Sequence, residues 1–219
     1  LSVFVLGLLG RGYDAFGQAR LLLEPQNPVQ GETVMITVEG ISDRKQVAKA
    51  LFNGKSVDFL VHQGKVMSFA PIDLRLAPGS YSVDVTLNDG SQLKEWIEVK
   101  ERKGEIFALG IPQKLGGNTV VSQKNLVNDI GDENVILNRV YSRADKKHFW
   151  KEKFIHPLDK VVVTDEYGSI RQTGEYQIPH KGTDFQAKIG TPLKSMNRGV
   201  VRVAQSGRIY GKTIVVDHG

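Results

Sequence analysis

The sequence predicts a mainly β protein: an immunoglobulin-like β-sandwich, then a linker helix, then a small antiparallel β-sheet domain. Residues 20–100 contain about seven short runs of alternating apolar and polar residues, separated by turn signals, which is typical of a sandwich. The apolar spacing then becomes helical, and short β-type runs return after residue 150. We therefore expect four segments, which span residues 1–19, 20–100, 101–149 and 150–219.

Composition restricts the chemistry that the chain can perform. The 219 residues include no Cys, which excludes a thiol nucleophile, a disulfide framework and a thiolate metal site. The formal net charge is +5, which favours anionic partners. These charges are scattered along the chain and form no dense basic run, so we expect no nucleic-acid partner.

Residues 1–10 form an apolar run that is too short to span a membrane. The run suits the apolar core of a secretory signal, and Ala15 and Ala19 offer small residues for cleavage. Since no Met or basic start precedes the run, we expect the signal to begin further upstream. We interpret residues 1–19 as a signal-peptide remnant, with a buried strand or helix as the alternative. The expected location is secreted or in the cell envelope (periplasm or cell wall), without stable membrane insertion.

The sandwich prediction depends on alternation and turns. Apolar and polar residues alternate most clearly over residues 34–39 and 81–87. Residues 76–81 resemble a recurrent turn of bacterial immunoglobulin-like domains. No catalytic group of residues appears here, so a spacer or positioning role is expected. The turn signals are Asn53-Gly54, Pro78-Gly79 and Asp89-Gly90.

The next segment begins with linker composition and continues as a helix. Residues 101–117 are rich in Gly and charge, and an apolar stripe at helical spacing follows from about residue 122 to 142. Ser122 is the expected N-cap, and Gly131 predicts a kink or two short helices. We expect the helix to pack on the following domain. The stripe consists of Leu126, Val127, Ile130, Leu137, Val140 and Tyr141.

His180 and Asp184 are the candidate metal ligands. Pro179 and Gly182 disfavour a helix here, so an extended strand is predicted, with His180, Gly182 and Asp184 on one face. The glycine would leave room for an ion between the imidazole and the carboxylate. These two groups are a partial ligand set for zinc, although a surface strand with a hydrogen-bonded His would give the same spacing.

Further blocks follow the His180-Lys181-Gly182-Thr183-Asp184 motif in close order. Together they resemble the lysostaphin-type zinc metalloendopeptidase family, whose members typically cut peptide cross-links in bacterial cell walls. Upstream, Phe154, Pro157, Tyr167-Gly168 and Arg171 are similar to the family's lead-in, with the arginine offset by about one residue. The later blocks are Gly190-Thr191-Pro192, Gly199-Val200-Val201, Tyr210-Gly211 and Asp217-His218-Gly219.

The resemblance implies that residues 150–219 belong to a zinc peptidase domain in which His180 and Asp184 bind zinc. The family's third ligand comes from an H-x-H motif beyond the Asp-His-Gly block, so we expect it after residue 219 and expect no turnover from this chain alone. No catalytic residue is assigned within the chain. The implied partner is bacterial peptidoglycan. A non-catalytic relative that binds or activates other cell-wall hydrolases is the alternative, and the cross-link and oligomeric state stay open.

Two other sites are rejected. Residues 207–213 look like a phosphate-binding loop, but only three residues separate the glycines and a strand pattern follows. The Gly168-Ser169-Ile170 segment lacks the G-x-S-x-G elbow of a serine hydrolase.

Overall fold

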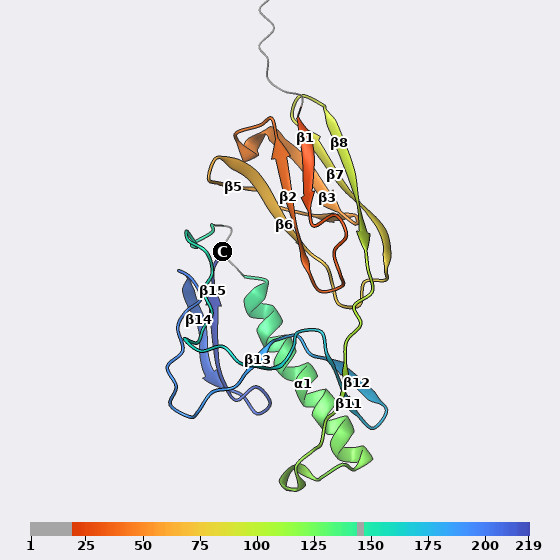
Figure 1. Cartoon of the computed structure of the whole chain (residues 1–219), viewed down its shortest axis with the longest axis vertical. Coiled ribbons are helices and arrows are strands. Elements are labelled where there is room, and N and C mark those ends of the chain that lie inside the picture. The colour runs from red at the N-terminus through yellow and green to blue at the C-terminus, as the bar shows by residue number, and fades with distance from the viewer. Residues whose placement is uncertain (1–18, 144–146) are drawn as a thin grey trace, which may run out of the picture. The chain divides into compact units, whose positions relative to one another are not determined.

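The computed structural model describes residues 19–143 and 147–219. Over these residues the protein is mainly β, with several small antiparallel sheets and one α-helix, which confirms the predicted fold class (Figure 1). It divides into two compact units, Leu1–Lys103 and Gly104–Gly219. Most of the predicted signal remnant, residues 1–18, lies outside the described residues.

The first unit is a sandwich of two four-stranded sheets. One sheet has the strand order β1-β2-β6-β5 and the other the order β4-β3-β7-β8, and all neighbouring strands are antiparallel. In sequence order this is the A-B-E-D and C-F-G arrangement of an immunoglobulin sandwich, with β4 added beside β3. The elements are β1 Arg20–Glu24, β2 Thr33–Glu39, the 3-10 turn Arg44–Gln46, β3 Val47–Phe52, β4 Lys55–Ser56, β5 Leu60–His62, β6 Lys65–Pro71, β7 Gly79–Leu87 and β8 Gln92–Val99.

Inward-facing residues of both sheets form one apolar core. Val34 and Ile36 of β2 and Val83 of β7 are completely buried, as the alternation predicts. Each such side chain contributes roughly 1.5–3 kcal/mol through its removal from water. Val83 follows Tyr81 by two positions, where antibody domains place the second Cys of their disulfide. This chain has no Cys, so apolar packing of Val83 takes the place of that disulfide in the core.

Two predicted turns have the backbone that their residues favour. Asn53 and Gly54 have φ values of 47° and 72° between β3 and β4, and a two-residue hairpin with positive φ at both positions is the type that suits Asn-Gly. The Tyr81 hydroxyl donates a hydrogen bond of 2.7 Å to the carbonyl of Ala77. This is the tyrosine corner of immunoglobulin-like domains, and it fixes the turn into β7.

The second unit contains three small sheets and a long helix. Strands β12, β11 and β9 form one sheet, β10 pairs with β13, and β14 pairs with β15. The elements are β9 Ile106–Ala108, the 3-10 turn Gln113–Leu115, α1 Val120–Tyr141, β10 Val163–Asp165, β11 Ile170–Thr173, β12 Tyr176–Pro179, β13 Asp184–Phe185, β14 Val200–Ser206 and β15 Lys212–Asp217.

Strand β9 corrects two expectations. It lies within residues 101–117, for which linker composition was predicted, and it pairs in parallel with β11 although only antiparallel pairing was expected. The apolar run Ile106–Ala108 is too short to stand out among the neighbouring glycines and charges. Its partner comes from residues 170–172, so no local signal marks the pairing.

The helix α1 also corrects two details. It runs without interruption through Gly131, and its N-cap is Thr119, whose hydroxyl oxygen accepts a 3.2 Å hydrogen bond from the backbone N–H of Ser122. An N-cap side chain usually accepts a hydrogen bond from the backbone N–H two or three residues further along the helix. Ser122 is therefore the residue whose N–H is capped, and it is not the N-cap itself. The stripe residues Leu126, Ile130 and Leu137 are half-buried.

Within the part of the chain that the structure describes, no helix has the length and apolar character needed to cross a membrane.

Candidate metal centre

The segment around His180 corrects the predicted single strand. Strand β12 ends at Pro179 and β13 begins at Asp184, so His180 lies in an irregular connection between them. This connection is tied to the turn before β11: the N–H of His180 donates to Ser169 O, and the N–H of Gly168 donates to His180 O, both at 2.8 Å. His180 is thereby fixed by backbone contacts even though it lies outside a strand.

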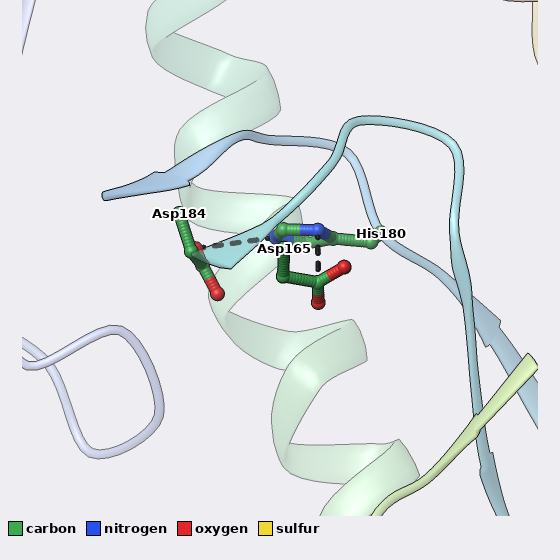
Figure 2. Close-up of side chains that lie close together, drawn as sticks. All are labelled: Asp165, His180 and Asp184. Atoms are coloured by element: carbon green, nitrogen blue, oxygen red, sulfur yellow. Dashed lines mark ion pairs between the residues drawn. The ribbon is translucent and has the colours of Figure 1, made fainter. Parts of the chain in front are cut away.

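The two predicted ligands nevertheless face each other. The Nε2 atom of His180 lies 3.3 Å from Oδ1 of Asp184, and Figure 2 shows the two side chains side by side. Gly182 lies between them in sequence, and a Cβ at this position would stand 3.7 Å from Nε2. A Cβ at that distance would make an ordinary van der Waals contact with the ring nitrogen.

The other ring nitrogen of His180 faces the opposite direction. Its Nδ1 atom lies 3.1 Å from the carbonyl oxygen of Glu166. The same atom lies 3.3 Å from Oδ2 of Asp165 (Figure 2). A carbonyl oxygen can only accept a hydrogen bond, so we assign the ring proton to Nδ1. The side chain is only 10% exposed, and Nε2, which carries the lone pair in this tautomer, faces Asp184 and Arg171.

Asp165 is the residue that the sequence analysis missed. It ends β10 and lies opposite Asp184 in the β10–β13 ladder, which brings both carboxylates to the same imidazole. Its Oδ1 atom accepts a 2.6 Å hydrogen bond from Ser169 Oγ, and its Oδ2 atom accepts one of 2.7 Å from Arg171. The hydrogen bond from Ser169, followed by those from Arg171 and the charges nearby, holds the pKa of Asp165 below its ordinary value.

Arg171, on β11, reaches all three of these side chains. Its Nη2 atom lies 2.7 Å from Asp165 Oδ2, 2.5 Å from Asp184 Oδ2 and 3.2 Å from His180 Nε2. Burial acts to lower the pKa of the guanidinium, but its hydrogen bonds to Asp165 and Asp184 and their charges raise that pKa overall. A permanent cation thus stands among groups that could also bind a metal.

The three side chains fit a zinc ion in part. One ligand atom from each of Asp165, His180 and Asp184 lies within 4.8 Å of the others. One ion can bind only one nitrogen of an imidazole, and Asp184 shares the Nε2 side while Asp165 shares the Nδ1 side. The arrangement therefore places two candidate ligands, His180 and Asp184, on the Nε2 side of the ring, and a third carboxylate, Asp165, within 3.3 Å of Nδ1.

Other histidines of the described residues have different surroundings. The Nδ1 atom of His218 lies 2.8 Å from the carbonyl oxygen of Arg198, and its ring meets Phe154 edge-on. His156 packs edge-on against Phe185. Neither lies in the group around His180.

Comparisons with known proteins add little to this geometry. No family model matches the chain. One solved structure that it resembles is SGBP-B of the Bacteroides ovatus mixed-linkage glucan utilization locus, in complex with a mixed-linkage heptasaccharide. The match covers 39% of this chain and 22% of that chain, with 16% sequence identity and a TM-score of 0.25. A similarity at this level supports no conclusion about fold or function.

Proposed function

We propose that this protein is a zinc metalloendopeptidase of the bacterial cell envelope that cleaves peptide cross-links of peptidoglycan, with His180 and Asp184 as two of its zinc ligands. The observation that carries the proposal is the 3.3 Å approach of His180 Nε2 to Asp184 Oδ1, with Nδ1 engaged on the other side of the ring. The sequence blocks around these residues, which resemble the lysostaphin-type family, supply the reaction and the substrate class.

Each residue of the site has a distinct role in this proposal. His180 binds as a neutral imidazole, because its proton is held at Nδ1 by the carbonyl of Glu166. Asp184 supplies negative charge on the Nε2 side, and Asp165 restrains the ring from the Nδ1 side. His180 and Asp184 would hold the zinc ion, which would supply Lewis-acid chemistry for polarising the scissile carbonyl and activating water near neutral pH. By the family resemblance, a histidine of an H-x-H motif is the third ligand.

Zinc binding tests the site directly. The wild-type protein, His180→Ala and the control His62→Ala are dialysed against zinc, and metal content is measured with isothermal titration of zinc alongside. His62 lies on β5 in the first unit and does not belong to the Asp165, His180 and Asp184 group, so this substitution removes a different imidazole. We expect His180→Ala to lose zinc that the wild type and the control retain. A zinc content in His180→Ala equal to that of the wild type would refute the assignment of His180 as a ligand.

Peptidoglycan digestion tests the reaction. The full-length protein is incubated with purified sacculi, and the release of peptides is followed for the wild type, His180→Ala and Asp184→Asn. Both variants should abolish release, because each removes a ligand. Release at the wild-type rate by either variant would contradict the peptidase proposal.

Arg171 favours a second candidate function, that of a non-catalytic relative that binds or activates other cell-wall hydrolases. Its guanidinium touches both proposed ligands and could hold them together without any metal. In that case the wild-type protein would bind no zinc at neutral pH, and it would accelerate a separate hydrolase acting on the same sacculi. Stoichiometric zinc together with peptide release by the protein alone would exclude this candidate.

A further inference from the structure

A large aromatic side chain stands exposed on the outer face of one sheet of the sandwich. Trp96, on the edge strand β8, is 54% exposed, while its neighbour Ile97 points inward and is 1% exposed. Most of an indole's surface is apolar, so leaving it in water costs free energy that burial would recover. The exposed indole therefore offers an apolar surface on which a ligand can pack.

Polar side chains beside Trp96 form a connected set. The Nζ atom of Lys94 lies over the indole, 5.0 Å from the ring centroid, and 3.0 Å from Oδ1 of Asp84. The other oxygen of Asp84, Oδ2, accepts a 2.6 Å hydrogen bond from Ser82 Oγ. In the β7–β8 ladder Ser82 stands opposite Trp96, and Asp84 opposite Lys94. The hydrogen bond from Ser82 and the contact with Lys94 hold the pKa of Asp84 below its ordinary value, so its carboxylate is charged at neutral pH.

The same pattern extends along the strand in both directions. Side chains two apart on a strand share a face and stand about 7 Å apart, given a rise of roughly 3.3–3.4 Å per residue. Gln92 precedes Lys94, and Glu98 follows Trp96, on this outer face; they stand opposite Thr86 and Ser80. The indole is thus the centre of a strip of hydrogen-bonding groups, which suits an elongated ligand better than a single small molecule.

We propose that this strip, defined by Gln92, Lys94, Trp96 and Glu98 of β8 with Ser82 and Asp84 of β7, is a binding site for a glycan chain. A pyranose ring presents a face of C–H groups that packs on an indole, and its rim of hydroxyls both donates and accepts hydrogen bonds. Asp84 accepts, Lys94 donates and Ser82 does both. Because these three side chains already hold one another, little conformational freedom is lost when a sugar binds.

Other occupants match the strip less well. Nucleic-acid bases also stack on indoles, but phosphates need cations that are not neutralised, and Lys94 is paired with Asp84. A protein interface of ordinary affinity needs an apolar centre of several residues, whereas the neighbours of Trp96 on this face are polar. The strip therefore matches a ligand that is apolar on one face and rich in hydroxyls at its edge.

Sugar binding can be measured on the full chain. Its other Trp, Trp150, is replaced in Trp150→Phe so that fluorescence reports on Trp96 alone. The probes are hexamers of β-1,4-linked N-acetylglucosamine and of β-1,4-linked glucose. The first probe rests on the proposed function, because N-acetylated amino sugars form the glycan strands of peptidoglycan; the second does not. We expect a saturable change in fluorescence with at least one of them.

Variants then locate the site. By isothermal titration, Trp96→Ala should weaken sugar binding at least tenfold, with a smaller loss for Trp96→Phe, which keeps an aromatic face, and for Asp84→Asn. His180→Ala should leave sugar binding unchanged, so a failure of the zinc proposal would not affect this one. Saturable binding that Trp96→Ala leaves intact, or no binding of either hexamer, would overturn the proposal. Binding of single-stranded DNA in place of both sugars would also overturn it.

Discussion

The Nη2 atom of Arg171 lies 3.2 Å from the Nε2 atom of His180, the ring nitrogen that zinc would need. The same atom donates a hydrogen bond to Asp184, the second proposed ligand. Zinc binding therefore requires the guanidinium to withdraw, and the free energy of breaking its hydrogen bonds is subtracted from the affinity for the metal.

Arg171→Gln should increase zinc affinity by about tenfold. A hydrogen bond to a charged group contributes roughly 1.5–3 kcal/mol, and only part of this is lost in a site that is partly open to water. Arg75→Gln, which removes one positive charge from an exposed ion pair with Asp73 in the other unit, is the matched control. Isothermal titration with zinc decides the direction. A lower affinity in Arg171→Gln would mean that the arginine organises the ligands and does not compete with the metal.

Asp165→Asn should weaken zinc binding about 10- to 100-fold, the usual effect of removing a group that orients a metal-binding histidine. Asparagine keeps the shape of the side chain but removes the charge beside Nδ1 of His180. Asp159→Asn provides a control, because Asp159 is an exposed carboxylate paired with Lys194. Nitrogen NMR shifts of the His180 ring give a second measurement, and in Asp165→Asn they should show less proton density fixed at Nδ1. Equal zinc affinity in the two variants would contradict the orienting role.

The sequence predicts the elements that depend on the periodicity of neighbouring apolar residues. It misses the contacts that depend on the pairing of strands far apart in the chain. The alternation in β2 and β7 and the helical stripe of α1 arise from neighbouring residues, so they are visible in the chain. Asp165 has no motif spacing to His180, and it reaches the imidazole because β10 pairs with β13. Strand β9 was missed for the same reason.

The candidate metal site shows both cases. The sequence predicts that the side chains of His180 and Asp184 lie together, and His180 Nε2 lies 3.3 Å from Asp184 Oδ1. The predicted continuous strand between them was wrong, because hydrogen bonds from the turn at Gly168 and Ser169 hold His180 after β12 has ended. Contacts of this kind join parts of the chain whose proximity only the fold reveals.

Tyr81→Phe should lower the unfolding free energy of the sandwich by about 1 kcal/mol, the net contribution of one hydrogen bond. The substitution keeps the ring and removes only the hydroxyl that donates to Ala77 O. Urea unfolding followed by circular dichroism measures the change, with Tyr141→Phe at the exposed end of α1 as the control. A midpoint for Tyr81→Phe equal to that of wild type would show that the tyrosine corner does not stabilise this sandwich.

Glu133 links α1 to the loop between β14 and β15 in a pH-dependent way. Its carboxylate accepts hydrogen bonds from the backbone N–H groups of Ile209, at 2.8 Å, and Tyr210, at 3.1 Å. These bonds, the one from Ile209 first, hold the pKa of Glu133 below its ordinary value of 4.5. A carboxyl group whose pKa is lowered on folding stabilises the folded state above its unfolded pKa. That stabilisation is lost as the pH falls through the folded value.

We therefore expect amide hydrogen exchange at Ile209 and Tyr210, corrected for the intrinsic pH dependence, to lose protection as the pH falls below the ordinary pKa of 4.5. Glu133→Gln, which cannot ionise, should show reduced protection already at pH 6 and little further change on acidification. Asp132→Asn, an exposed neighbour on the same helix, serves as the control and should follow the wild type. If the wild type and Glu133→Gln lost protection in parallel, the carboxylate would not be what holds this loop against the helix, because only the wild type can gain a proton there.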